Sequence, residues 1–303
     1  MPPPSWTIKA LIDVTTDYFR EKGIDSPRLD AELLLSHLLQ CRRLDLYLRF
    51  DQPLSRDELT GYRSLVRRRA GREPLQYICG RQEFWSLDFE VGPGVLIPRQ
   101  ETELLVEKAL DLHREGALSG GGRPRVLDLG TGSGILAVCM AREIETARVW
   151  ASDLSGEALD RARRNARSHG LDARIAWVQG DLFSPFRPAG GKRFDLILAN
   201  PPYVPEEELE GLAPEVRDHE PTQALNGGPG GMDVVRRILR ESPAFLSTGG
   251  WLLMELDPRQ VDEALETAGA AEAYDRMEAI RDNSRRFRAI SARVKPAGEG
   301  SHA

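Results

Sequence analysis

The stretch that decides the fold is Val126-Leu127-Asp128-Leu129-Gly130-Thr131-Gly132-Ser133-Gly134, in which a short apolar run leads directly into a glycine-rich turn. A run of this length and composition predicts a buried strand. The residues after the turn have the pattern of a helix that extends to about Glu143. Strand, turn and helix in this order form the unit from which parallel sheets are built.

The alternation of strands and helices continues toward the C-terminus. Further helices are expected up to about His169 and over 233–245 and 259–268. Further strands are expected at 147–152, 174–178, 194–199, 251–256 and 287–292. We therefore predict an α/β domain with a doubly wound sheet over residues 101–295, introduced by a helix over 101–114.

The N-terminal part has a different pattern, which is helical throughout. Ser26 with Pro27 predicts the start of one helix, and Ser55 with Glu58 predicts a capping box at the start of another that ends at Gly71. No strand pattern interrupts residues 5–80. The prediction is a small helical bundle over residues 1–80, acting as a substrate-recognition domain.

A linker separates the two parts. Residues 84–91 partly alternate between apolar and polar, Gly92-Pro93-Gly94 predicts a turn, and an apolar run follows at 95–97. We expect a β-hairpin linker over residues 81–100. At the other end of the chain, residues 296–303 have the composition of a disordered tail.

Composition excludes several classes of protein. The chain has 303 residues, of which 41% are hydrophobic and 29% charged, which is typical of a soluble protein with two domains. A net charge of −6 argues against a general nucleic-acid binder. Cys41, Cys79 and Cys139 form no C-x-x-C pair, so neither a disulfide framework nor a metal site is expected. Without a signal sequence or a membrane-length apolar run, a cytoplasmic location with no membrane contact is expected.

One basic cluster stands out, formed by Arg67, Arg68, Arg69 and Arg72. Most such runs are solvated helix faces. The alternative is a contact for an acidic partner surface, and the sequence leaves both open.

The predicted strand ends place polar groups along one edge of the sheet. The glycines at 130, 132 and 134 allow a ligand to approach the backbone at a helix N-terminus, and their G-x-G-x-G spacing disfavours a dinucleotide. Asp153 ends the second strand, where it can accept both hydroxyls of a ribose. Asp181 follows the third strand and can accept from an adenine amine, with Leu182 and Phe183 as walls for the base.

The fourth strand ends in Asn200-Pro201-Pro202-Tyr203. Two prolines remove backbone donors and leave carbonyls that can accept, and Asn200 adds an amide oxygen. Tyr203 can offer a flat face for stacking. Two acceptors that hold the hydrogens of a planar NH2 group out of plane favour its nucleophilic geometry, so no general base is required. The alternative is that the tetrapeptide is only a strand-ending turn.

With these residues in hand, the chain resembles class I S-adenosylmethionine-dependent methyltransferases, and within them the HemK/PrmC family. The resemblance extends beyond the glycine loop and the tetrapeptide to Glu73-Pro74-Leu75-Gln76-Tyr77-Ile78 with Gly80, Val95-Leu96-Ile97-Pro98-Arg99, Glu101-Thr102-Glu103, His219-Glu220-Pro221, Ala224-Leu225 and Gly227-Gly228.

The resemblance implies methyl transfer from S-adenosylmethionine to the side-chain amide nitrogen of the glutamine in the Gly-Gly-Gln motif of peptide chain release factors, which would be the protein partners. It places cofactor contacts on Gly130, Thr131, Gly132, Ser133, Gly134, Asp153, Leu182 and Asn200, to which the strand-end argument adds Asp181. It places glutamine contacts on Asn200, Pro201, Pro202 and Tyr203.

Two departures from the family pattern are present. Gln100 stands where a proline is common, which could loosen a helix start, and Asp257 adds a charge near a strand end.

Two other functions stay open at this point. An adenine-N6 nucleic-acid methyltransferase would use the same tetrapeptide on a flipped base and would need a basic channel. In a non-enzymatic protein, the α/β domain would bind the cofactor as a structural element and the bundle would be an adaptor.

Overall fold

The computed structural model describes residues 6–118, 122–187, 194–282 and 284–296. The chain forms two compact units, one of Met1–Arg81 with Ala213–His219 and the other of Gln82–Leu212 with Glu220–Ala303. The predicted disordered tail lies outside the described residues except for Pro296. Each unit has its own core.

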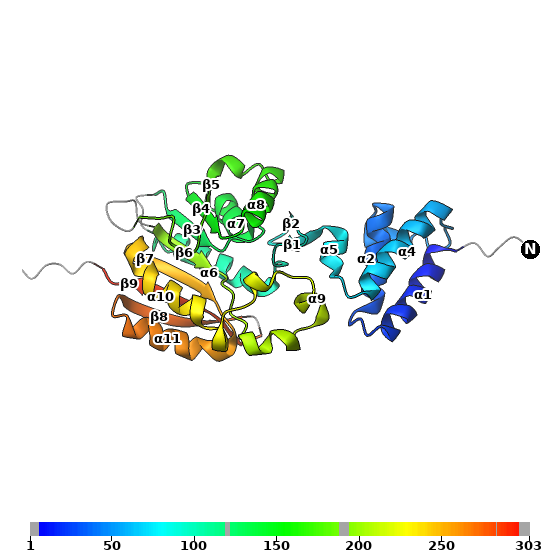
Figure 1. Ribbon diagram of the computed structural model, residues 1–303. Coiled ribbons are helices and arrows are strands. Elements are labelled where there is room, and N and C mark those ends of the chain that lie inside the picture. The colour runs from blue at the N-terminus through cyan, green and yellow to red at the C-terminus, as the bar shows by residue number, and fades with distance from the viewer. Residues whose placement is uncertain (1–5, 119–121, 188–193, 283, 297–303) are drawn as a thin grey trace, which may run out of the picture. The chain divides into compact units, whose positions relative to one another are not determined.

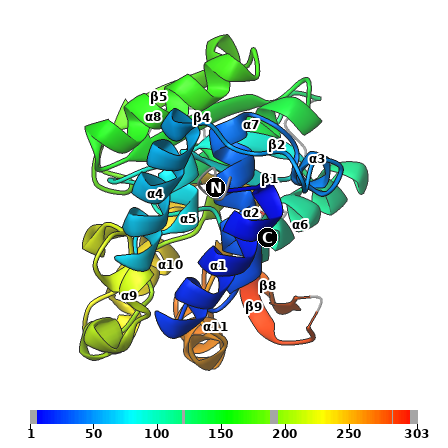
Figure 2. The same ribbon diagram turned by 90° about the vertical axis from the view of Figure 1, so that its right-hand side faces the viewer.

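The first unit consists of helices. These are α1 (Ile8–Glu21), α2 (Pro27–Leu39), α3 (Arg43–Tyr47), α4 (Arg56–Ala70), α5 (Leu75–Cys79) and α9 (Pro214–Arg217). Helices α1, α2 and α4 lie side by side (Figures 1 and 2) around a core that includes the fully buried Phe19, Leu35 and Tyr62. The Tyr62 hydroxyl donates to the Ala31 carbonyl at 3.0 Å, which ties α4 to α2.

The predicted helix starts in this unit are confirmed. Ser55 and Glu58 form the capping box of α4, with the Ser55 hydroxyl accepting the Glu58 N–H at 3.2 Å and the Glu58 carboxylate accepting the Ser55 N–H at 2.7 Å. Pro27 is the first residue of α2, but the Ser26 side chain forms no capping hydrogen bond. In α2 the fixed φ of proline therefore sets the start without help from the preceding hydroxyl.

Two arginines of the basic cluster, Arg69 and Arg72, form ion pairs inside this unit. Arg69 is buried, and its guanidinium contacts Asp30 at 2.7 Å and Glu215 at 3.0 Å. Arg72 contacts the same Glu215 at 3.1 Å. Each charge of a buried ion pair loses its hydration, so it needs several hydrogen-bonding partners to compensate. For Arg69 the expectation of a solvated face is therefore wrong, and so is that of a contact open to an acidic partner.

The linker hairpin lies earlier in the chain than predicted. Its strands are β1 (Arg81–Phe84) and β2 (Leu87–Glu90), joined by Trp85 and Ser86 at φ 53° and 56°. Two consecutive positive φ values suit the twist of a two-residue hairpin turn. The predicted turn at 92–94 is present, with the Val95 N–H donating to the Gly92 carbonyl at 3.4 Å, but the prediction of a second strand at 95–97 is wrong. Ile97 donates its N–H to the Glu220 carboxylate at 3.0 Å instead of to a neighbouring strand.

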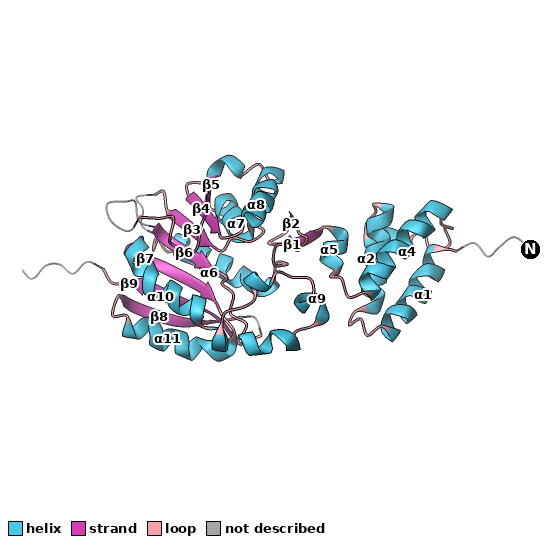
Figure 3. Ribbon diagram, viewed as in Figure 1, coloured by secondary structure: helices cyan, strands magenta, loops and turns pink. Residues whose placement is uncertain are grey.

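The second unit is built on a seven-stranded sheet in the order β5-β4-β3-β6-β7-β9-β8, shown in magenta in Figure 3. All neighbours are parallel except that β9 runs antiparallel to both β7 and β8. The strands are β3 (Arg125–Leu129), β4 (Arg148–Asp153), β5 (Ile175–Gln179), β6 (Phe194–Ala199), β7 (Leu246–Glu255), β8 (Tyr274–Arg281) and β9 (Phe287–Val294).

The doubly wound α/β prediction is confirmed, but β8 was missed. The segment Tyr274–Arg281 carries several charges, and most of its side chains are partly or fully exposed. Charged side chains are common on edge strands, where they discourage pairing with another chain. Its strand character therefore comes from pairing with β9 and was not visible in the sequence pattern.

Helices cover both faces of the sheet. On one face lie α6 (Glu103–Arg114), α7 (Ile135–Glu143) and α8 (Gly156–Ser168), and on the other lie α10 (Asp233–Phe245) and α11 (Val261–Ala270). Successive residues of a strand point to opposite faces. In β6, Leu196 and Leu198 join the core under the first set of helices, whereas Ile197 and Ala199 join the core under the second.

This topology brings the ends of five parallel strands to one edge. Starting from β3, the sheet extends through β4 to β5 in one direction and through β6 to β7 in the other. The strand order reverses between β3 and β6, and such a switch point leaves a crevice beyond the carboxyl ends of the strands. The residues that follow Leu129, Gln179 and Ala199 therefore border one crevice.

Candidate active site

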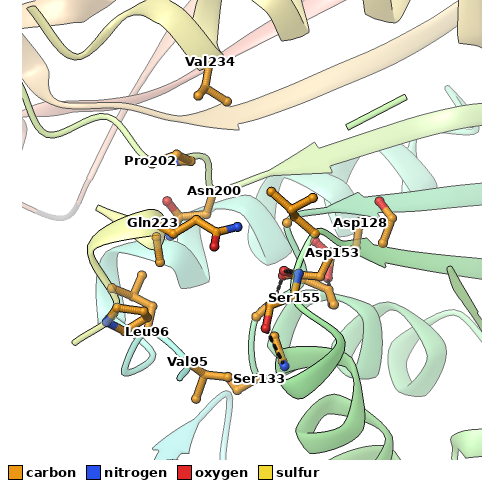
Figure 4. Close-up of a pocket in the computed structure, with 18 of the residues that line it drawn as sticks. Val95, Leu96, Asp128, Ser133, Asp153, Ser155, Asn200, Pro202, Gln223 and Val234 are labelled. Atoms are coloured by element: carbon orange, nitrogen blue, oxygen red, sulfur yellow. Dashed lines mark hydrogen bonds between the residues drawn. The ribbon is translucent and has the colours of Figure 1, made fainter. Parts of the chain in front are cut away.

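A cavity of about 750 Å³ lies at this edge of the sheet. In Figure 4, Asp128, Asp153 and Ser155 lie on one side of it, and Asn200, Gln223 and Leu96 lie on the other. Most of the site residues expected from the sequence line it, namely Gly130, Thr131, Gly132, Ser133, Asp153, Asp181, Leu182, Asn200 and Pro202. Gly134, Pro201 and Tyr203 are not among the lining residues.

Two residues of the glycine loop, Gly132 and Gly134, have different structural roles. Gly132 has φ 55°, and a Cβ added to it would meet nothing within 4 Å, so its backbone faces open space. Gly134 has φ 88°, and a Cβ there would lie 2.9 Å from the Cβ of Ala162 on α8. Gly132 therefore keeps the cavity open, while Gly134 allows the start of α7 to pack closely against α8.

Asp153 is fixed by backbone donors. Its Oδ2 accepts from the Gly132 N–H at 2.9 Å and its Oδ1 from the Ser155 N–H at 2.9 Å. Burial raises the pKa of Asp153, and these N–H groups oppose that rise. A carboxylate oxygen has two lone pairs, so each oxygen can accept one more hydrogen bond. Both can serve a pair of hydroxyl groups in the cavity.

Asp128 is a site residue that the sequence reasoning quoted but did not assign. Its Oδ2 accepts from the Thr131 hydroxyl at 2.6 Å and from the Ala137 N–H at 3.0 Å. Its Oδ1 is buried and has no hydrogen-bond partner among the described residues. Burial raises the pKa of Asp128 to about 7. An acid inside the apolar run directly before the glycine loop was the signal that could have revealed it.

A buried carboxylate oxygen without a donor favours a cationic group beside it. Leaving such an oxygen unpaired costs the free energy of its lost hydration, about 1–3 kcal/mol or more. Because Asp128 lines the cavity, an ammonium group held there would supply the missing donor.

The end of the cavity where the sequence predicts a base differs in part from that prediction. Leu182 lines it with φ 46°, and Leu154, which is 52% exposed, lines it as well. Asp181 also lines the cavity, and both of its oxygens accept from Arg237, at 3.2 and 3.0 Å. The expectation that Phe183 forms a wall is wrong. Its ring is buried in the core and stacks on Phe245 at 4.6 Å.

At the end of β6, only the NH2 group of the Asn200 amide forms a hydrogen bond. Its Nδ2 donates to the Thr102 hydroxyl oxygen at 3.0 Å. Within the described parts of the chain, no donor bonds Asn200 Oδ1 or the carbonyl oxygens of Pro201 and Pro202. Of these residues, Asn200 and Pro202 line the cavity, whereas Pro201 is buried and does not.

Tyr203 is held away from the cavity. Its hydroxyl donates to Glu255 Oε1 at 3.0 Å, and its ring packs against the core beneath α10 and α11. Glu255 is buried at the end of β7, and burial raises its pKa and that of Tyr203. The structure thus gives Tyr203 an anchoring contact that the sequence reasoning did not foresee.

A buried glutamate fastens the linker to the loop after β6. Glu220 Oε1 accepts from Arg99 at 2.5 Å, and its Oε2 accepts from the Ile97 N–H at 3.0 Å. Arg99 and Gln223 both line the cavity. The sequence reasoning quoted Arg99 and Glu220 as family markers without giving either a role.

The two departures from the family pattern lie outside the cavity lining. Gln100 begins the short 3-10 helix η1 (Gln100–Thr102). Asp257 accepts the Arg259 N–H at 2.9 Å and caps the 3-10 helix η6 (Pro258–Gln260).

Comparison with known proteins identifies the family. Residues 10–80 match the model of the PrmC N-terminal domain, and residues 126–219 match that of a methyltransferase domain. The chain is 47% identical to the release factor glutamine methyltransferase of Geobacter sulfurreducens, over 87% of this chain and 88% of the relative. It is 40% identical to that of Rhodopirellula baltica, over 94% and 96% of the two chains. The chain belongs to the release factor glutamine methyltransferase family.

This membership confirms the resemblance inferred from the sequence. The chain is an S-adenosylmethionine-dependent methyltransferase, so the non-enzymatic alternative is wrong. The class I methyltransferase fold is confirmed as well. The N-terminal domain of human METTL16 superposes with a TM-score of 0.52 at 18% identity, covering 76% of this chain and 81% of that one.

S-adenosylmethionine fits the residues of the cavity. Its ammonium group matches the unpaired Oδ1 of Asp128, its ribose hydroxyls match the free lone pairs of Asp153, and its adenine matches the apolar Leu154 and Leu182. The open backbone at Gly132 leaves room for the amino-acid part.

The described residues contain neither a membrane-spanning helix nor a cluster of metal ligands. No helix in that part of the chain is both long and apolar enough to cross a membrane. The same residues contain no group of three or more His, Cys, Asp or Glu side chains that could hold a metal ion.

Proposed function

We propose that this enzyme methylates the side-chain amide nitrogen of the glutamine in the Gly-Gly-Gln motif of peptide chain release factors. The observation that carries the proposal is the set of free acceptors at Asn200 Oδ1 and at the carbonyls of Pro201 and Pro202. Asn200 and Pro202 line the same cavity as the cofactor-binding residues. A carboxamide NH2 group has two hydrogens to donate, and this edge offers acceptors for both.

The residues that would hold the cofactor lie at the ends of β3, β4 and β5. Asp128 would pair with the ammonium group, Asp153 would accept from the ribose, and Asp181 with Leu182 would contact the adenine. When bound, S-adenosylmethionine supplies a methyl group activated by a sulfonium. The protein's contribution is to bind it beside the Asn200 edge and to exclude water.

Asn200 and the proline carbonyls would act on the acceptor. An amide nitrogen is a weak nucleophile because its lone pair is delocalised into the carbonyl. Acceptors that hold its two hydrogens out of plane favour the pyramidal geometry, and they stabilise the positive charge that develops on the nitrogen. No side chain has to remove a proton before the methyl group is transferred, because the methylated nitrogen can release one proton to water afterwards.

The protein partner follows from the names of the relatives, which are release factor glutamine methyltransferases. Arg99, Thr222 and Gln223 line the cavity beside Asn200 and would contact the backbone around the glutamine. The helical bundle over residues 1–80 would recognise the rest of the release factor. A cytoplasmic location, where release factors act, is part of the same proposal.

Mass spectrometry of a release factor after incubation with the enzyme and S-adenosylmethionine tests the proposal. One added methyl group is expected on the tryptic peptide that contains the Gly-Gly-Gln motif. A release factor in which that glutamine is replaced by glutamate should gain none. Parallel incubations with DNA and RNA test the adenine-N6 alternative. Methylation of nucleic acid with no methylation of the release factor would overturn the proposal.

A further inference from the structure

The amide of Asn200 has to be turned the right way for the proposed function, on which this inference rests. An asparagine amide has an acceptor at one end and a donor at the other, and the two ends have nearly the same shape. Only Oδ1 can accept from a glutamine NH2 group. With the amide reversed, two NH2 groups would face each other across the cavity and the hydrogen bond would be lost.

Thr102 decides which end faces the cavity. Its hydroxyl lies 3.0 Å from Asn200 Nδ2 and 2.6 Å from Glu255 Oε2. A hydroxyl has a single hydrogen, and in this geometry it is given to the glutamate. Toward Asn200 the Thr102 oxygen can then only accept, so it binds the NH2 end of the amide and leaves Oδ1 for the substrate.

Glu255 in turn fixes the hydroxyl of Thr102. A carboxylate offers acceptors only, so the hydroxyls of Thr102 and Tyr203 both donate to it, one to each oxygen. Thr102 is completely buried and Glu255 is 2% exposed, so little water competes for these bonds. The three side chains come from η1, the end of β7 and the segment after β6, and they meet behind Asn200.

We propose that Thr102 and Glu255 are positioning residues of the methyl transfer, which act by holding the Asn200 carboxamide with its oxygen toward the substrate glutamine. They do not touch the reacting atoms in this scheme. Their contribution appears only through Asn200, and this dependence separates a positioning role from a general effect on stability.

The test is a double-mutant cycle between Thr102→Val and Asn200→Ala, read as kcat for release-factor methylation. Valine has nearly the shape of threonine without the hydroxyl. We expect Thr102→Val to lower kcat by roughly tenfold to a hundredfold, with the Kd for S-adenosylmethionine within about twofold of wild type. In the Asn200→Ala background the same change should cost less than about twofold, because the group that Thr102 orients is gone.

Three further variants separate the orientation of Asn200 from other effects of the substitutions. Thr102→Ser retains the hydroxyl and should keep kcat within about threefold of wild type. Glu255→Gln, which can donate to Thr102, should lower kcat in the same way as Thr102→Val. The matched control is Ser242→Ala, which removes a buried hydroxyl bonded to Tyr274 at 2.7 Å in the core and should leave kcat unchanged. Calorimetry with S-adenosylmethionine shows that each variant is folded.

The inference is overturned if Thr102→Val costs the same factor in both backgrounds, or if Thr102→Val and Glu255→Gln are both as active as wild type. If Thr102→Val does not bind the cofactor, Glu255→Gln takes its place in the double-mutant cycle with Asn200→Ala, and the result of that cycle decides whether the inference holds. A wild-type enzyme that leaves the release factor unmethylated refutes the proposed function itself, which is a separate outcome.

Discussion

The two sides of the active site are built by different means. On the cofactor side, at the ends of β3, β4 and β5, backbone groups do much of the fixing, and the N–H groups of Gly132 and Ser155 hold Asp153. On the acceptor side, at the ends of β6 and β7, Asn200, Thr102, Glu255 and Tyr203 hold one another through side-chain hydrogen bonds. The position of Asp153 therefore depends on the course of the backbone. The position of Asn200 depends on which polar side chains are buried around it.

This difference predicts where substitutions act. Changes on the cofactor side should alter binding of S-adenosylmethionine or stability, whereas changes on the acceptor side should alter the rate of transfer and leave that binding intact. The predictions below test this separation, beginning with the largest effect.

Asn200→Ala should produce the largest loss. Removing one acceptor that stabilises the transition state costs about 3 kcal/mol, so kcat should fall by about a hundredfold or more. The Kd for S-adenosylmethionine should change little, because the other proposed cofactor contacts lie at the ends of β3, β4 and β5. Steady-state kinetics on a release factor and calorimetry with the cofactor check both parts. Near-normal turnover would contradict the acceptor role of Asn200.

Binding of S-adenosylmethionine should strengthen as pH rises toward 7. Burial raises the pKa of Asp128 to about 7, and only the ionised form can pair with an ammonium group. Between pH 5.5 and 7 the ionised fraction rises by about tenfold, and the Kd should fall by about the same factor. Calorimetry over this range measures the effect, and Asp128→Asn should abolish the dependence. An unchanged slope in that variant would place the cation elsewhere.

The same raised pKa has a consequence for stability. A carboxyl whose folded pKa lies above its unfolded value is protonated more readily in the folded state. Its contribution to the free energy of unfolding is therefore lost as pH rises from about 4 to about 7. Thermal denaturation without the cofactor should show a smaller decline over this range for Asp128→Asn than for wild type. An equal decline in the two proteins would argue against a strongly perturbed Asp128.

Gly134→Ala should act through packing. An added Cβ would lie 2.9 Å from the Cβ of Ala162, and the positive φ of 88° disfavours any L side chain. We expect a loss of about 1–3 kcal/mol in the free energy of unfolding, measured by denaturant titration. Ala137→Gly, a buried position later in α7, is a control for disturbance of the helix alone. Wild-type stability in Gly134→Ala would show that α7 and α8 can separate at little cost.

Tyr203→Phe should give the smallest effect and separates two roles of this residue. The ring is kept, and the hydroxyl that donates to Glu255 is removed. If the hydroxyl helps to hold the network behind Asn200, kcat should fall by roughly threefold to tenfold, in line with the loss of one hydrogen bond. A kcat equal to that of wild type would show that the hydroxyl plays no part in holding Asn200.

The sequence predicted the cofactor side better than the acceptor side. The cavity lined by residues 130–133, Asp153 and Leu182 could be predicted because close backbone approach requires glycine, and because parallel strands end at one edge. Thr102 and Glu255 lie 153 positions apart in the chain. Nothing local marks a buried threonine and a buried glutamate as partners, so their pairing required the fold.

The errors in the fold have a similar origin. The hairpin turn was expected at the glycines and proline of 92–94, but it lies at Trp85-Ser86, where both residues adopt a conformation that glycine or asparagine usually provides. Strand β8 was missed because it lies at the edge of the sheet and is held by β9 rather than by an apolar pattern. In both places the strands are set by pairing with the next strand along the chain, and the glycine and apolar patterns do not mark them.

A ternary crystal structure with S-adenosylhomocysteine and a release factor tests the central claim most directly. The account predicts the nitrogen of the Gly-Gly-Gln glutamine side chain within hydrogen-bonding distance of Asn200 Oδ1 and of a carbonyl oxygen of Pro201 or Pro202, with Asn200 Nδ2 still on Thr102. A glutamine bound elsewhere, with these oxygens facing solvent, would contradict it.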